Sequence, residues 1–188
     1  MGVIPGNLVM IFWLAACLLF QGSLAFAQQS APNATQPILT VDVPVVLCID
    51  DQPAAGGRPT GSAYAKAAAN GFRSILTLRS EKDGVDTLRE RLLVEQNKMR
   101  YFNLPAKTNL PGPEQVDEFL RIAKDKANHP MLINCAFAER VAPYMMIFRI
   151  VEQGWAEEKA LADATQVGLR RDDLQKFARN YMSARRGN

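Results

Sequence analysis

The chain has 188 residues and a formal net charge of +3 at pH 7, with 22 Lys and Arg against 19 Asp and Glu. This length is enough for one domain of ordinary size. The small positive charge is spread along the chain, which suits an anionic small substrate. No basic run interleaved with aromatic residues is present, so we do not expect nucleic acid as a partner.

The first 27 residues form a segment of their own. They contain no Lys, Arg, Asp or Glu, and Leu8 to Phe20 is unbroken apolar sequence, followed shortly by Ala25-Phe26-Ala27. This pattern predicts a secretory signal peptide at residues 1–27, and hence an exported protein, periplasmic or secreted. The apolar run is shorter than the roughly 20 residues that a membrane span needs. The alternatives are an uncleaved membrane anchor and a lipoprotein box at Leu14-Ala15-Ala16-Cys17.

The mature chain is predicted to begin with a disordered lead over residues 28–40, which is mostly polar. Residues 41–188 are predicted to form one α/β domain. Its first strand is expected at Val41–Ile49. A loop at Asp50–Thr60, with a turn at Gly56-Gly57-Arg58-Pro59, is expected to follow.

Strands and helices alternate along the rest of the chain. The second helix is expected to bury Val85, Leu88 and Leu92 on one face, and the third to bury Val116 and Phe119 with Leu120 and Ala123. This alternation implies a central, mostly parallel sheet with helices on both faces. The expected elements are a helix at 61–69 capped by Thr60 and ended by Asn70-Gly71, a strand at 72–78, a helix at 85–96, a strand at 101–104, a helix from Pro113, a strand at 131–134, and helices at 141–151, 157–167 and 172–184.

The most informative stretch runs from Met131 to Arg140. A buried strand ends at Cys135, four residues intervene, and Arg140 then precedes an apolar helix with Pro143 in its first turn. A helix N-terminus offers free N–H groups and the positive end of the helix dipole, which suits an anion. The same field would favour a thiolate nucleophile. The pattern therefore predicts Cys135 and Arg140 as a catalytic pair.

Charged residues follow several of the predicted strands. In a parallel sheet the ligand lies beyond the carboxyl ends of the strands, where the cysteine loop also lies. The residues expected near the cysteine for this reason are Asp50, Asp51, Arg58, Arg79 and Lys107.

Three stretches carry a family resemblance: Gly71–Arg79, Tyr101–Pro105 with the proline-led helix behind it, and Asn134–Val141. In this order they resemble the dual-specificity and tyrosine-type cysteine phosphatases, most closely the bacterial phosphatase-like group associated with beta-lactamase-hydrolase-like proteins. The resemblance covers about Val41 to Leu169 and implies the three-layer α/β fold of those phosphatases.

The resemblance also implies a chemistry. Cys135 would attack phosphorus, Arg140 would bind the phosphoryl oxygens, and an aspartate from another loop would protonate the leaving group. The substrate would be a phosphorylated small molecule or a phosphoprotein, with no cofactor and no metal. The phosphate-binding groups would be the backbone N–H groups of Ala136, Phe137, Ala138, Glu139 and Arg140.

The loop departs from the family pattern. Most of these phosphatases have five residues between Cys and Arg, whereas the most similar group has four and reads Cys-Ala-Ser-Gly-Asn-Arg-Val. Here Phe137, Ala138 and Glu139 stand where that group has Ser, Gly and Asn. If the glycine position needs a positive φ, alanine costs about 1–2 kcal/mol there, and the loop could flatten.

Two further groups of the family are replaced. Asn134 stands where a histidine usually precedes the cysteine, and it can donate a hydrogen bond but cannot be a cation. The loop at residues 105–112, where the general acid is expected, has no carboxylate. General acid catalysis is typically worth about 10²–10⁴-fold, so good leaving groups would be favoured over alkyl groups.

Three functional hypotheses follow. The first is a phosphate monoester hydrolase with Cys135 as nucleophile and Arg140 as phosphate clamp. The second is a pseudophosphatase, a domain that binds an anion or a phospholigand without turnover. The third is a rhodanese-like sulfurtransferase, because rhodanese loops also commonly place four residues after the cysteine. A redox pair between Cys135 and Cys48 is a minor alternative.

Overall fold

The computed structural model describes residues 54–56, 59–105 and 110–186, all of which belong to one compact unit, Pro32–Asn188. The predicted signal peptide, the lead at 28–40 and the first predicted strand lie outside the described residues. So do Cys48 and four of the charged residues expected near the cysteine, which are Asp50, Asp51, Arg58 and Lys107.

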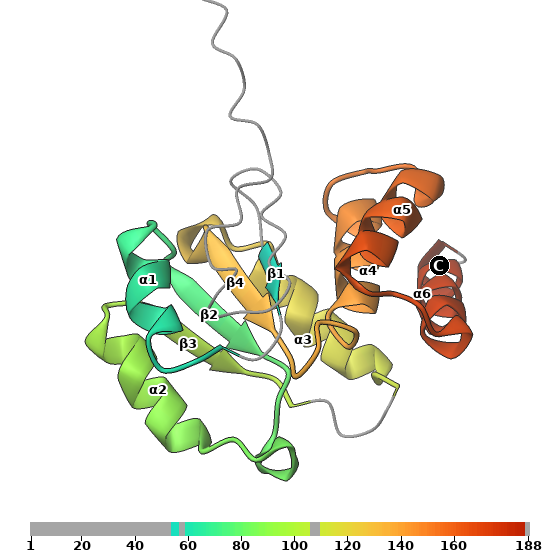
Figure 1. Ribbon diagram of the computed structural model, residues 1–188. Helices are drawn as coiled ribbons and strands as arrows, with labels where there is room; N and C mark the ends of the chain where they lie inside the picture. Colours follow the sequence, from blue (N-terminus) through green and yellow to red (C-terminus); the bar gives the residue numbers. More distant parts are fainter. Residues whose placement is uncertain (1–53, 57–58, 106–109, 187–188) are drawn as a thin grey trace, which may run out of the picture. The chain divides into compact units, whose positions relative to one another are not determined.

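Four parallel strands form the central sheet in the order β1-β4-β2-β3: β1 (Ala54–Gly56), β2 (Ser74–Thr77), β3 (Arg100–Asn103) and β4 (Met131–Asn134) (Figure 1). The predicted parallel sheet is confirmed. However, β1 falls in the stretch predicted as a loop, so that prediction is wrong there. The strand pairs with β4, from Leu132 to Asn134. Pairing with a partner far along the chain stabilises it, and local propensity does not report such pairing.

Helices cover both faces of the sheet: α1 (Ala63–Ala69), α2 (Thr87–Gln96), α3 (Pro113–Ala123), α4 (Ala142–Val151), α5 (Glu157–Val167) and α6 (Asp172–Arg186). The first two pack on one face and α3 and α4 on the other, while α5 and α6 pack against α4. The predicted layered α/β fold is confirmed. None of the described helices is long and apolar enough to cross a membrane.

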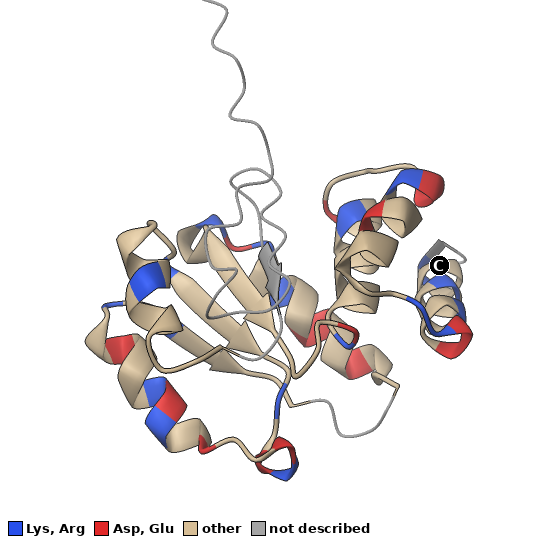
Figure 2. Ribbon diagram, viewed as in Figure 1, with Lys and Arg blue, Asp and Glu red and all other residues tan. Residues whose placement is uncertain are grey.

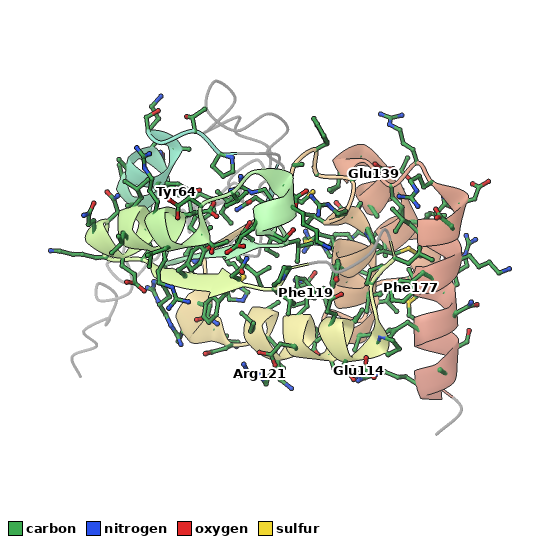
Figure 3. The ribbon with its side chains drawn as sticks, turned by 90° about the horizontal axis from the view of Figure 1, so that it is seen from below. Tyr64, Glu114, Phe119, Arg121, Glu139 and Phe177 are labelled. Carbon is green, nitrogen blue, oxygen red and sulfur yellow. The ribbon has the colours of Figure 1, made fainter. Side chains whose placement is uncertain are left out.

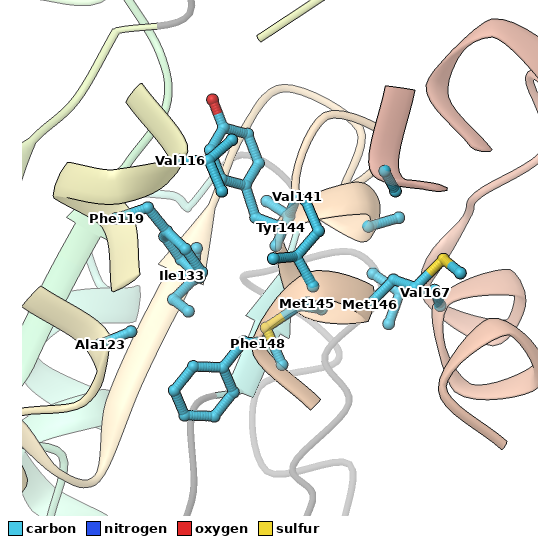
Figure 4. Packing of buried hydrophobic residues seen from close by; sticks show 14 of the residues in the cluster. Val116, Phe119, Ala123, Ile133, Val141, Tyr144, Met145, Met146, Phe148 and Val167 are labelled. Atoms are coloured by element: carbon cyan, nitrogen blue, oxygen red, sulfur yellow. The ribbon is translucent and has the colours of Figure 1, made fainter. Parts of the chain in front are cut away.

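The central strands β2 and β4 are buried on both faces, as strands of parallel sheets are. Along β2, Ile75 belongs to the core beneath α1 and α2, and Leu76 to the larger core beneath α3 and α4. The apolar face predicted for α3 is confirmed, because Val116, Phe119, Leu120 and Ala123 are all buried in that larger core (Figure 4).

The predicted apolar face of α2 is wrong. Leu88 is 67% exposed and Leu92 is 51% exposed, whereas Glu90 and Val94 are the buried residues of this helix. The reason is a polar network around Glu90, described below, which fixes the rotation of the helix. The outer surface of α2 carries charges of both signs (Figure 2).

The ends of α1 also differ from expectation. The helix begins at Ala63 with Ser62 as its N-cap, two residues later than predicted, and the side chain of Thr60 does not cap it. Thr60 contributes its carbonyl instead, which accepts from the N–H of Ala63 at 3.0 Å. The predicted stop is confirmed, because Asn70 is the C-cap and Gly71 has a φ of +83°.

Candidate functional site

The cysteine loop joins the sheet to the N-terminus of a helix. β4 ends at Asn134, Cys135 follows, and the ten-residue helix α4 begins at Ala142. Cys135 is a free thiol with 1% of its surface exposed. The N–H of Leu78 donates to the carbonyl of Asn134 at 2.8 Å, which ties the end of β2 to the start of the loop. The loop therefore lies at the carboxyl end of two central strands, where ligands bind in such sheets.

Ala138 gives the loop its shape. Its φ is +65°, in the left-handed region, so this alanine adopts the conformation that favours glycine. The strain is about 1–2 kcal/mol. The carbonyl of Ala138 accepts from the N–H groups of Val141 (2.9 Å) and Ala142 (3.2 Å), which starts α4. The loop has therefore not relaxed to escape the strain, and strained backbone of this kind clusters at functional sites.

The end of α5 supports the loop from behind. A Cβ added to Gly168 would lie 3.7 Å from both Cα and N of Glu139, so the backbone of the two segments is in close approach. Ala138 itself is completely buried. Packing on this side explains how the surrounding structure holds Ala138 in its strained conformation.

Arg140 is held in place by an aspartate that the sequence analysis did not single out. Its Nη2 donates to Oδ1 of Asp83 at 2.8 Å and its Nη1 to Oδ2 at 3.2 Å, and the two side chains are 22% and 21% exposed. Burial lowers the pKa of Arg140, but the hydrogen bond with Asp83 and the interaction with Cys135 outweigh it and raise the pKa above its ordinary value. The guanidinium therefore stays charged and lies within interaction reach of Cys135.

Asp83 is fixed by its own loop. The N–H of Ser80 donates to Oδ2 of Asp83 at 2.8 Å, forming a capping box over the short turn Glu81–Asp83. The hydrogen bond from Arg140 holds the pKa of Asp83 below its ordinary value. The lowered pKa favours the ionised carboxylate, which pairs with the arginine. The pattern Ser80-x-x-Asp83 is the sequence signal that could have revealed a fixed carboxylate here.

The backbone N–H groups of residues 136–140 are the predicted phosphate donors. Among the hydrogen bonds that the described residues make with one another, none is donated by these five groups. The side chain of Phe137 is 85% exposed. Glu139 lies beside the C-terminal helices (Figure 3). Its charge helps to raise the pKa of Arg171, after the larger effect of Asp173, so Glu139 has a cationic neighbour outside the loop.

Arg79 contacts the loop only through Asn134. Its Nε donates to Oδ1 of Asn134 at 3.2 Å, and Oγ1 of Thr77 donates to the same atom at 3.1 Å. Arg79 therefore lies near the cysteine loop, as expected, but it is 4% exposed and also pairs with Glu90. A cation nevertheless lies directly behind Asn134, the residue that replaces the usual histidine.

The comparisons with known proteins agree with this geometry. A family model described as "DSP-PTPase phosphatase fused to NAD+ Kinase" matches residues 51–182. The chain therefore belongs to this family of dual-specificity-type cysteine phosphatases. No curated protein matches the chain.

Solved structures show the same fold at low identity. A DUF442 phosphatase from Shewanella putrefaciens CN-32 is 14% identical, with a TM-score of 0.65 over 77% of this chain and 92% of that one. TpbA from P. aeruginosa, in complex with phosphotyrosine, is 17% identical, with a TM-score of 0.60 over 80% and 91%. The core catalytic domain of the PP-IP phosphatase SIW14 from S. cerevisiae is 17% identical, with a TM-score of 0.60 over 69% and 80%.

Proposed function

We propose that the protein hydrolyses phosphate monoesters through Cys135, with Arg140 as the phosphate clamp. The observation that carries this proposal is the fixed geometry of the loop. Asp83 holds the guanidinium beside the cysteine, and Ala138 keeps a left-handed conformation despite its strain. An enzyme that positions its groups before the substrate arrives has less reorganisation to make during reaction.

The proposed reaction has two steps. The Cys135 thiolate attacks phosphorus, the bond from phosphorus to the leaving oxygen breaks, and a thiophosphoryl intermediate forms. Water then attacks this intermediate and releases inorganic phosphate and the thiolate. Arg140 and the N–H groups of residues 136–140 stabilise the negative charge on the phosphoryl oxygens in both steps.

The leaving group sets the substrate class. The loop at 105–112 has no carboxylate, and Asp83 is held ionised by Arg140. Aryl phosphates need little help from an acid, whereas alkyl phosphates suffer without one. We therefore favour a small aryl phosphate or a protein carrying phosphotyrosine as substrate, in keeping with the phosphotyrosine bound to TpbA.

The test is phosphate release from p-nitrophenyl phosphate by the purified protein. Cys135→Ser should abolish release, because serine lacks the thiolate. Arg140→Lys should reduce kcat/KM by about 10²-fold or more, because lysine keeps the positive charge but cannot form the bidentate hydrogen bonds of a guanidinium. Equal rates for the wild type and Cys135→Ser would contradict the proposal.

A non-catalytic binding domain is the second candidate. It is favoured by the lack of a carboxylate in the loop at residues 105–112 and by Ala138 and Glu139 in place of the glycine and asparagine of the resembling group. It predicts no turnover, but binding of inorganic phosphate that is lost in Arg140→Met. Phosphate release that depends on Cys135 would reject it.

We also propose export, on the apolar segment and the Ala25-Phe26-Ala27 site alone. When the full chain is expressed in a bacterial host, the protein recovered from the periplasm or medium should begin at Gln28. An intact N-terminus on protein found in the membrane fraction would indicate an uncleaved anchor, and intact protein in the cytoplasm would reject export.

A further inference from the structure

Tyr144 is the one tyrosine of the chain whose hydroxyl has no hydrogen-bond partner. The chain has four tyrosines, and all four are described. The hydroxyls of Tyr64 and Tyr101 donate to Glu90, and that of Tyr181 donates to Asp117. The hydroxyl of Tyr144 is buried and makes no hydrogen bond, and the whole residue is only 1% exposed. Burying a hydroxyl without a partner is unfavourable, so packing alone does not account for it.

The position of Tyr144 connects it to the phosphate site. It lies four residues after Arg140 and is the third residue of α4. The positive charge of Arg140 acts on its phenol, opposing the rise in pKa that burial causes. Tyr144 also shares the larger core with Cys135, and the two residues are equally buried. The hydroxyl therefore belongs to the surroundings of the Cys135–Arg140 pair.

The ring is held within the core, and its hydroxyl is buried. It packs edge-on against Phe119, with ring centroids 5.0 Å apart. Figure 4 shows the oxygen at the end of the ring directed away from Met145 and Phe148, the centre of the packed cluster. This orientation uses the ring as a core residue and directs the unpartnered O–H away from the centre of the cluster.

We propose that the hydroxyl of Tyr144 donates a hydrogen bond to a phosphoryl oxygen of the anion held by Cys135 and Arg140. This assignment deepens the proposed function and rests on it for the identity of the anion. The hydroxyl stays protonated at any usable pH, because burial raises its pKa above the ordinary value. It therefore acts as a hydrogen-bond donor throughout the reaction and transfers no proton. Such a donor adds to the electrostatic stabilisation that Arg140 provides.

The test is Tyr144→Phe, which removes one oxygen and keeps the ring. Tyr181→Phe is the matched control, because it makes the same change at a buried tyrosine whose hydroxyl has a partner. Three quantities are measured on the full protein: Tm, the affinity for inorganic phosphate, and kcat/KM for p-nitrophenyl phosphate. Tyr144→Phe should weaken phosphate binding about tenfold and lower kcat/KM by about 10²-fold. Its Tm should rise by about 2–4 °C, because an unpartnered hydroxyl is removed.

The control should give the opposite pattern. Tyr181→Phe should lower Tm, because Asp117 loses a donor, and should leave phosphate affinity and kcat/KM unchanged. A purely structural role for Tyr144 would change Tm without changing phosphate affinity or turnover, and would overturn the assignment.

The outcomes separate this assignment from the proposed hydrolysis. If the wild type turns over and Tyr144→Phe matches it, hydrolysis stands and the role of Tyr144 is rejected. If the wild type does not turn over but Tyr144→Phe weakens phosphate binding, hydrolysis is rejected and the donor role stands. If the wild type neither turns over nor binds phosphate, both are rejected.

Discussion

Two arginine–carboxylate pairs lie near the ends of the central strands β2 and β4, and they differ in surroundings more than in chemistry. The side chains of Arg79 and Glu90 are 5% and 4% exposed, and the Glu90 carboxylate also accepts hydrogen bonds from Tyr64 and Tyr101. Arg140 and Asp83 are each about one-fifth exposed, and their contacts lead to the cysteine loop. The first pair is enclosed by protein donors and acceptors, whereas the second stands at the edge of the site.

The comparison shows that a buried pair and a partly exposed pair can have different roles, one in stability and the other in binding. A buried charge pair is costly to desolvate, and it is tolerated when other hydrogen bonds satisfy both partners, as around Glu90. A partly exposed pair contributes little to stability, but it can fix a side chain for binding. We therefore expect changes at Arg79 to be felt in folding and changes at Asp83 to be felt in activity.

The largest expected effect is that of Arg79→Met. The substitution leaves the carboxylate of Glu90 buried without its cation, which should cost about 3–5 kcal/mol in the free energy of unfolding. Urea denaturation measures the loss. The control is Arg179→Met, which breaks an exposed pair with Glu157 and should cost no more than about 1 kcal/mol. A loss at Arg79 as small as that at Arg179 would mean that the buried network does not hold α2 in place.

The next effect concerns the strained loop. Ala138→Gly removes a left-handed penalty of about 1–2 kcal/mol. It also loses one buried methyl, worth about 0.8 kcal/mol, and adds unfolded-chain entropy of about 0.4–1 kcal/mol. The free energy of unfolding should therefore change little. Ala67→Gly, at an equally buried helical alanine, should lose about 2 kcal/mol. Equal losses in the two variants, measured by urea denaturation, would show that Ala138 is not strained.

The helices α3 and α2 show what the sequence could and could not predict. The apolar spacing of α3 was sufficient, because Val116 and Phe119 are buried by ordinary packing. The same reasoning failed for α2, because the charged Glu90 is buried through partners that come from α1, β3 and the loop after β2. Spacing within one helix cannot report such partners.

The site was predictable to a similar degree. Cys135 and Arg140 were predicted from the order strand, thiol, arginine and helix, which the structure has, and the strain at Ala138 was inferred from the resembling loop. Asp83 was missed because its partner is 57 residues away in the chain. Tyr144 was also missed, because an apolar run that contains a tyrosine reads as packing. The missing hydrogen bond at its hydroxyl appears only in three dimensions.

A small stability effect, with a clear functional one, is expected for Asp83→Asn. Its pKa is lowered by the hydrogen bond from Arg140, so its contribution is complete above the ordinary carboxyl value of 3.8 and is lost as the pH falls below it. At pH 7 the variant should lose less than about 1 kcal/mol, and the Tm gap to the wild type should narrow as the pH falls below 3.8.

Activity should respond more strongly to Asp83→Asn. Asparagine offers Arg140 one oxygen instead of two, so the guanidinium is less well fixed and kcat/KM for p-nitrophenyl phosphate should fall about tenfold. Glu118→Gln is the control. Glu118 forms an exposed pair with Arg121, which also lowers the pKa of the Glu118 carboxyl. Breaking this pair should leave activity unchanged. A Tm gap that does not narrow at all as the pH falls below 3.8 would mean that Asp83 acts through packing. Unchanged kcat/KM in Asp83→Asn would mean that Arg140 is positioned without Asp83, which would remove the functional half of the contrast between the two pairs.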